Sequence, residues 1–125
     1  MIFRVARHTN NLNAIKDFYQ KILGFELLGQ FTNHSGYDGV FLGLKELGWH
    51  LEFTQSKDVA HPSFDEDDIL VFYPENILTF NAVIENIETY AVSKLEPKNP
   101  YWKTKGMLIK DPDGYNIIVS DLKIT

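Results

Sequence analysis

The chain has 125 residues, a formal net charge of −5 and no cysteine, and 14% of its residues are aromatic. This length suits one domain with a real hydrophobic core, and the lack of cysteine excludes disulfides, thiolate metal sites and thiol nucleophiles. The net negative charge, together with the lack of a Lys/Arg stripe, argues against nucleic-acid binding. Because no apolar run is long enough for a signal peptide or a membrane span, we predict a soluble, cytoplasmic protein that does not bind membranes.

The first half of the chain predicts one strand, one helix and three further strands. Residues 2–8 alternate as in a strand, and Asn10 or Asn11 is a suitable N-cap for a helix over residues 11–23. Gly24 should end that helix. The strands that follow are expected at residues 25–31, 36–42 and 49–55.

The second half repeats this order after an acidic segment. Residues 56–67 are predicted to be a linker, and the Asp65–Asp68 run is expected to be solvated. A strand over 69–73 is followed by Pro74, which should open a helix over 75–88. Further strands are expected at 92–95, 106–110 and 115–121, with a tight turn at Asp111–Gly114. The prediction is an α+β chain of two βαβββ modules, residues 1–55 and 68–125.

The stretch from His50 to Gln55 alternates polar and apolar residues, so His50, Glu52 and Thr54 should share one face of a strand. By the same parity, Arg4 and His8 share one face of the first strand. An ionised carboxylate such as Glu52 is costly to bury without a partner. The sequence therefore predicts that Glu52 has a counter-charge or a hydrogen-bond donor near it.

Two groups of motifs carry a resemblance to a known family. Phe18-Tyr19 and Leu23-Gly24-Phe25 lie on and after the first helix, while Trp102, Gly106 and the turn at Asp111–Gly114 lie near the end of the chain. In this order, on a doubled module, they resemble the vicinal oxygen chelate superfamily, which includes glyoxalase I, bleomycin- and fosfomycin-resistance proteins and extradiol dioxygenases. The resemblance implies two βαβββ modules that form facing half-barrels around a cleft with a divalent metal. It also implies a homodimer.

The resemblance implies four metal-ligand positions, and only one of them carries a ligand here. The positions fall on Arg4, Glu52, Ile69 (Asp68 if the register slips by one) and Ile118. One matching residue cannot hold a catalytic ion, which needs about three protein ligands. We therefore predict that no metal binds and that the Arg4 guanidinium replaces it in a bidentate pair with Glu52. The alternative is a solvated Arg4, with Glu52 bonded to His50 or a tyrosine.

Further candidate ligand-binding residues are His8, Tyr37, His50 and Trp102. Trp102 lies in a loop with Pro100 and either stacks on a ligand or covers the sheet as core. His8, His50 and Glu52 are an alternative set of ligands for a divalent metal such as Zn, Ni, Mn or Fe.

Three functions fit these residues. The first is a protein that binds a small molecule in the cleft, as bleomycin-resistance proteins do. The alternative is a metal-dependent lyase, isomerase or dioxygenase that uses the displaced His/Glu site. A third is a metal-free enzyme in which Glu52 is the catalytic general base and Arg4 binds an anionic substrate.

Overall fold

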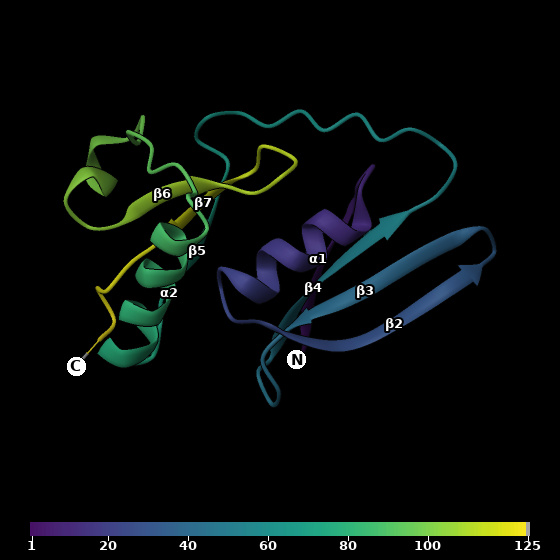
Figure 1. Ribbon diagram of the computed structural model, residues 1–125, viewed down its shortest axis with the longest axis horizontal. Helices are drawn as coiled ribbons and strands as arrows, with labels where there is room; N and C mark the ends of the chain where they lie inside the picture. Colours follow the sequence, from purple (N-terminus) through teal and green to yellow (C-terminus); the bar gives the residue numbers. More distant parts are fainter. Residues whose placement is uncertain (125) are drawn as a thin grey trace. The chain divides into compact units, whose positions relative to one another are not determined.

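A computed structural model describes residues 1–124, which divide into two compact units. Unit 1 comprises residues 1–62, and unit 2 begins at Ser63 (Figure 1). Both contain one α-helix and one mixed sheet, so the predicted α+β class with two modules is confirmed.

Unit 1 has a four-stranded sheet in the order β1-β4-β3-β2. β1 pairs in parallel with β4, while the β3–β4 and β2–β3 pairs are antiparallel. Helix α1 packs on β3 and β4. The elements are β1 (Phe3–His8), α1 (Leu12–Lys21), β2 (Glu26–His34), β3 (Tyr37–Gly43) and β4 (Trp49–Gln55).

The start of α1 is held by two side-chain caps. Asn11, one of the two predicted N-cap residues, accepts a hydrogen bond at its side-chain oxygen from the Ala14 amide at 3.0 Å. The Gln55 side chain accepts from the Leu12 amide at 2.9 Å and donates to the Asn10 carbonyl at 3.0 Å. The end of β4 is thereby tied to the first turn of α1.

The core of unit 1 lies between α1 and one face of the sheet. The fully buried Tyr19 ring lies 5.1 Å from that of Phe53 and 6.1 Å from that of Phe25. Arg7 reaches into the same layer, where its guanidinium lies 5.0 Å from the Phe53 ring and donates to the Tyr19 hydroxyl at 3.5 Å. Odd-numbered residues of β1 and β4 therefore face the helix, which leaves the even-numbered ones on the opposite face.

Unit 2 has a three-stranded sheet in the order β5-β7-β6, in which β5 and β7 are parallel and β6 and β7 antiparallel. Its elements are β5 (Ile69–Phe72), α2 (Ile77–Thr89), a short 3₁₀ helix η1 (Pro100–Lys103), β6 (Met107–Lys110) and β7 (Asn116–Val119). The predicted turn before β7 is present. The Asp111 carboxylate accepts from the amides of Asp113 at 2.9 Å and Tyr115 at 3.0 Å.

Two predictions for unit 2 are wrong. Pro74 does not open α2, since the helix begins after Asn76, whose side-chain oxygen accepts from the Thr79 amide at 2.8 Å. The strand expected at 92–95 is reduced to a single bridge between Leu95 and Leu108. Pro97 follows closely and has no backbone N–H, so it cannot donate to a longer ladder.

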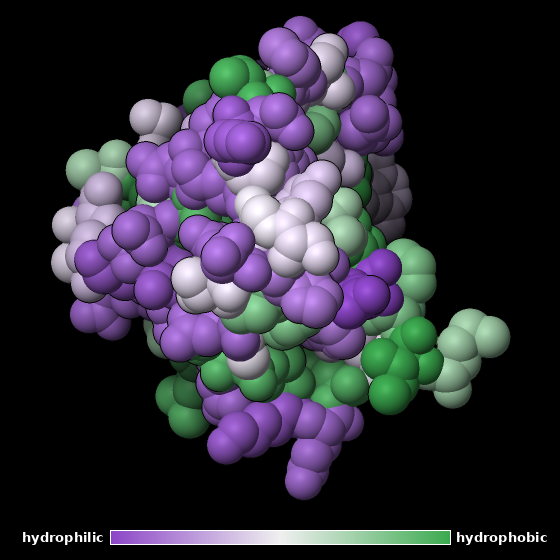
Figure 2. Space-filling view, turned by 90° about the vertical axis from the view of Figure 1, so that its right-hand side faces the viewer, coloured by the Kyte–Doolittle hydropathy of each residue, from purple (hydrophilic) through white to green (hydrophobic). Residues whose placement is uncertain are grey.

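The surface is mostly hydrophilic on the side that carries hairpin β2–β3, with smaller apolar groups toward its lower edge (Figure 2). No helix within residues 1–124 is both long enough and apolar enough to cross a membrane.

Candidate ligand-binding site

The even-numbered residues of β1 and β4 lie together on the polar face of unit 1, as their parity predicts. In the parallel register Arg4 is opposite His50, Ala6 is opposite Glu52 and His8 is opposite Thr54. These neighbours project to the same side of the sheet. The five polar side chains predicted on these two strands are therefore on one surface.

Arg4 and Glu52 form an ion pair, but not the predicted bidentate one. The Arg4 Nε lies 3.9 Å from Glu52 Oε1, and the exposed fractions of the two side chains are 51% and 13%. The Arg4 guanidinium also lies 5.8 Å from the centre of the Phe41 ring. A single long contact to a half-exposed arginine stabilises a fold by only about 0–1 kcal/mol. Glu52 has its counter-charge, in a weaker form than the sequence suggested.

His8 is held by two hydroxyl groups that the sequence analysis did not connect with it. Its Nδ1 lies 2.8 Å from the Thr54 hydroxyl and its Nε2 lies 3.1 Å from the Ser56 hydroxyl. The Tyr37 ring packs edge-on against the imidazole at 5.7 Å. A neutral imidazole has one donor and one acceptor nitrogen, so both nitrogens are in use. Thr54 and Ser56 are two residues apart at the end of β4. The alternation of the strand therefore already indicated in the sequence that both side chains lie on the same side.

His50 does not join His8 and Glu52 in a metal site. Its ring packs edge-on against Phe41 at a centroid distance of 5.7 Å. Among the His, Asp and Glu side chains of residues 1–124, no three lie in an arrangement that could hold a metal ion. The described side chains therefore do not bring His8, His50 and Glu52 together as a ligand set, because the partners of His8 are hydroxyls and that of His50 is an aromatic ring.

The four positions that the family resemblance assigns to a metal do not fit one either. They supply a cation at Arg4, a carboxylate at Glu52 and hydrocarbon side chains at Ile69 and Ile118. In unit 2, Ile118 belongs to a buried apolar cluster with Trp102 and Leu108, against which Ile69 packs. Divalent ions bind oxygen, nitrogen or thiolate ligands, and the two isoleucines offer none.

The same two isoleucines line a pocket of about 320 Å³ in unit 2. Trp102, which is 9% exposed, belongs to the core and also forms part of the pocket wall, so its core role is confirmed while its ligand-binding role stays a prediction. The apolar wall consists of Ile69, Leu108, Ile118, Trp102, Pro97 and Pro100. This volume lies at the lower end of the range for small-molecule sites.

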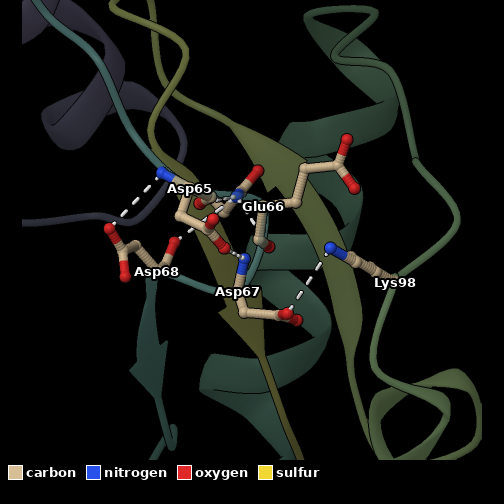
Figure 3. A network of polar contacts seen from close by, with 6 residues as sticks. Asp65, Glu66, Asp67, Asp68 and Lys98 are labelled. Carbon is tan, nitrogen blue, oxygen red and sulfur yellow. Dashed lines mark hydrogen bonds and ion pairs between the residues drawn. The ribbon is translucent and has the colours of Figure 1, made fainter.

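Polar residues line the remainder of the pocket, and the sequence analysis did not assign a binding role to them. They are Glu66, Asp67, Lys98 and Asn99. The Lys98 ammonium lies 3.8 Å from a carboxylate oxygen of Asp67, and both side chains are more than half exposed (Figure 3). The one feature of the sequence that pointed to these residues was the acidic run from Asp65 to Asp68, and such a run is also expected on any solvated surface.

The chain matches two family models, one in each unit. The model of the YycE-like N-terminal domain matches residues 3–54, and that of the YycE-like C-terminal domain matches residues 67–121. The uncharacterized protein YycE of Bacillus subtilis (strain 168) is 38% identical over 125 residues, which cover 96% of this chain and 87% of that protein. The chain belongs to the YycE-like family.

Solved structures show that this YycE-like chain has the glyoxalase fold. A YycE protein of unknown function from Bacillus subtilis, proposed to be a glyoxalase/fosfomycin resistance protein, has a TM-score of 0.87 and 37% identity, covering 99% of this chain and 91% of that one. Leishmania major glyoxalase I has a TM-score of 0.75 and 20% identity, covering 98% and 87%. The fosfomycin resistance protein FosX from Listeria monocytogenes has a TM-score of 0.66 and 12% identity, covering 94% and 88%. The last two similarities concern the fold alone.

Proposed function

We propose that this YycE-like chain is a member of the vicinal oxygen chelate superfamily that binds a small organic molecule without the divalent metal of that superfamily. The observation that carries the proposal is the position of Ile69 and Ile118. Both residues stand where the family resemblance places metal ligands, and both line the apolar pocket beside Trp102.

The pocket supplies the kind of surface from which a small ligand gains binding energy. Burial of apolar area contributes roughly 25 cal/mol per Å², and an indole ring offers a flat face for an aromatic group. Pro97 and Pro100 bound the pocket on a segment with restricted backbone freedom. An apolar site with a few polar groups at its edge is typical of small-molecule binding.

The polar face of unit 1 is the second part of the proposal. Arg4, His8, Tyr37 and His50 are candidate ligand contacts there, because they add a guanidinium, two imidazoles and a phenol to one region of the sheet. Glu52, beside Arg4, is the carboxylate that would serve as general base in any reaction on this face. We place the protein in the cytoplasm.

The metal part of the proposal is tested by equilibrium dialysis of the purified protein against nickel, zinc and manganese, followed by elemental analysis. We expect less than stoichiometric retention, with no difference between the wild-type protein and Glu52→Gln. Tight stoichiometric binding that is lost in Glu52→Gln would contradict the proposal and assign the chain to the metal-dependent enzymes.

The binding part is tested by calorimetric titration with 2-naphthalenemethanol, a neutral aromatic probe, in the presence of EDTA. Trp102→Leu and Ile69→Asn should each weaken binding about tenfold, the effect of losing about 1.4 kcal/mol of contact. Trp49→Leu, in unit 1, is the matched control and should bind as the wild-type protein does. Circular dichroism identifies any variant that fails to fold. Equal binding by the folded pocket variants would contradict the proposal.

A further inference from the structure

The edge of the unit 2 pocket carries more negative than positive charge, and this excess affects which ligands the pocket admits. Glu66 and Asp67 contribute carboxylates, whereas Lys98 contributes the cation among the pocket-lining residues. The formal charge of the lining is therefore negative by one unit. The following inference rests on the proposed function, since it specifies the ligand of the same pocket.

The four acids from Asp65 to Asp68 have two different roles. The Asp65 carboxylate accepts from the Asp67 amide at 2.8 Å, and that of Asp68 accepts from the Asp65 amide at 3.4 Å. These two carboxylates thus shape the turn before β5. In Figure 3 Glu66 and Asp67 instead extend toward the side where Lys98 lies, and both line the pocket.

Lys98 is already neutralised by one of these two acids. A dashed line joins its ammonium to Asp67, at 3.8 Å, and none joins it to Glu66 (Figure 3). Within residues 1–124 the Glu66 side chain has no hydrogen bond or ion pair, although its backbone carbonyl accepts from the Asn116 amide group at 3.1 Å. The charge left over at the pocket edge is therefore the Glu66 carboxylate.

We propose that the unit 2 pocket selects a compact apolar or aromatic molecule that carries one cationic amine, with Glu66 as the counter-charge. The apolar part lies against Trp102, Ile69 and Ile118, where hydrocarbon walls exclude water. A carboxylate at the edge of such a wall attracts a ligand ammonium and repels a ligand carboxylate. The Lys98–Asp67 pair stays at the edge and does not compete for the cation, because it is internally neutral.

The inference is tested with three probes that share a naphthalene ring. They are 2-naphthylmethylammonium, 2-naphthalenemethanol and 2-naphthoate, titrated calorimetrically at low salt and in EDTA. We expect the cation to bind about threefold more tightly than the neutral alcohol and the anion to bind most weakly, as for a partly solvated charge pair. The preference should shrink at 0.5 M salt, about five times the concentration at which the screening length is about 10 Å.

Two variants separate the effect of the Glu66 carboxylate from the effect of the protein's net charge. Glu66→Gln should abolish the preference for the cation, while Glu85→Gln, an equal charge change on an exposed position of α2, should retain it. Equal affinity for all three probes, or tightest binding of the anion, would overturn the choice of ligand but leave the pocket proposal standing. Failure of all three probes to bind would overturn the proposed function itself.

Discussion

The guanidinium of Arg4 and the carboxylate of Glu52 meet across neighbouring parallel strands, with 3.9 Å between Nε and Oε1. The family resemblance places metal ligands at both positions, so a side-chain cation stands beside the remaining carboxylate. The contact is single and half-exposed, which makes it a weak interaction that a solvent molecule or ligand could replace at small cost.

Arg4→Ala should therefore lower the free energy of unfolding by about 0–1 kcal/mol at neutral pH, as for an exposed pair. Urea denaturation measures this difference. A double-mutant cycle with Glu52→Ala isolates the coupling between the two side chains, which should lie within the same range. A loss of about 3 kcal/mol or more would show that the pair behaves as a buried one.

Arg4→His restores the residue type that the resembled family uses at this position, yet it should add little affinity for nickel or zinc. Positions 69 and 118 remain isoleucines, so histidine and Glu52 would be two ligands where about three are needed. Calorimetric titration of the variant against the wild-type protein tests this. The account is wrong if Arg4→His binds either ion tightly and in a one-to-one ratio.

Gly106→Ala should destabilise unit 2 and narrow its pocket. A Cβ at this position would lie 2.5 Å from Ile118 Cγ2 and 3.2 Å from Trp102 Cε3. Overpacking of this kind costs about 1–3 kcal/mol. Because Ile118→Ala removes the closest carbon, the double variant Gly106→Ala/Ile118→Ala should lose less stability than the sum of the two single variants. Strict additivity in chemical denaturation would contradict the predicted contact.

We also expect a homodimer. Unit 1 exposes several apolar side chains, and exposed apolar groups of this kind are often covered by a partner. They are Ile2, Phe3, Leu28, Tyr37, Leu44, Leu47 and Val59. A two-fold interface would bring the same surface of both copies together. Analytical ultracentrifugation at micromolar concentration should give twice the mass of the 14.4 kDa chain, and a single 14.4 kDa species would refute the dimer.

Local patterns were sufficient to predict most of the fold. Asn11, the apolar spacing of α1 and Gly24, at φ +72, mark a helix that depends little on the rest of the chain. The segment at 92–95 was mispredicted because a strand requires a ladder, and the bridge from Leu95 to Leu108 does not extend into one. Whether such a ladder forms is decided by residues distant in sequence.

Most of the candidate site on unit 1 was predictable, whereas on unit 2 only Trp102 was named in advance as a ligand-binding residue. Parity grouped Arg4 with His8 on one strand and Glu52 with His50 on another, since every second residue of a strand shares a side, and the family resemblance brought the two strands together. The distance and exposure of the pair depend on side-chain conformations, which parity does not fix. The pocket combines Glu66 with Lys98 and Ile118, segments that only the folded unit brings together.

The central claim is that the pocket beside Trp102 binds an organic molecule without a metal, and amide NMR of the ¹⁵N-labelled protein in EDTA tests it most directly. The two tryptophans give two indole N–H signals, which Trp49→Leu assigns. On titration with 2-naphthylmethylammonium or 2-naphthalenemethanol, we predict that the Trp102 signal shifts and saturates while the Trp49 signal stays in place. An unmoved Trp102 signal with both probes, or one that moves only after zinc is added, would contradict the account.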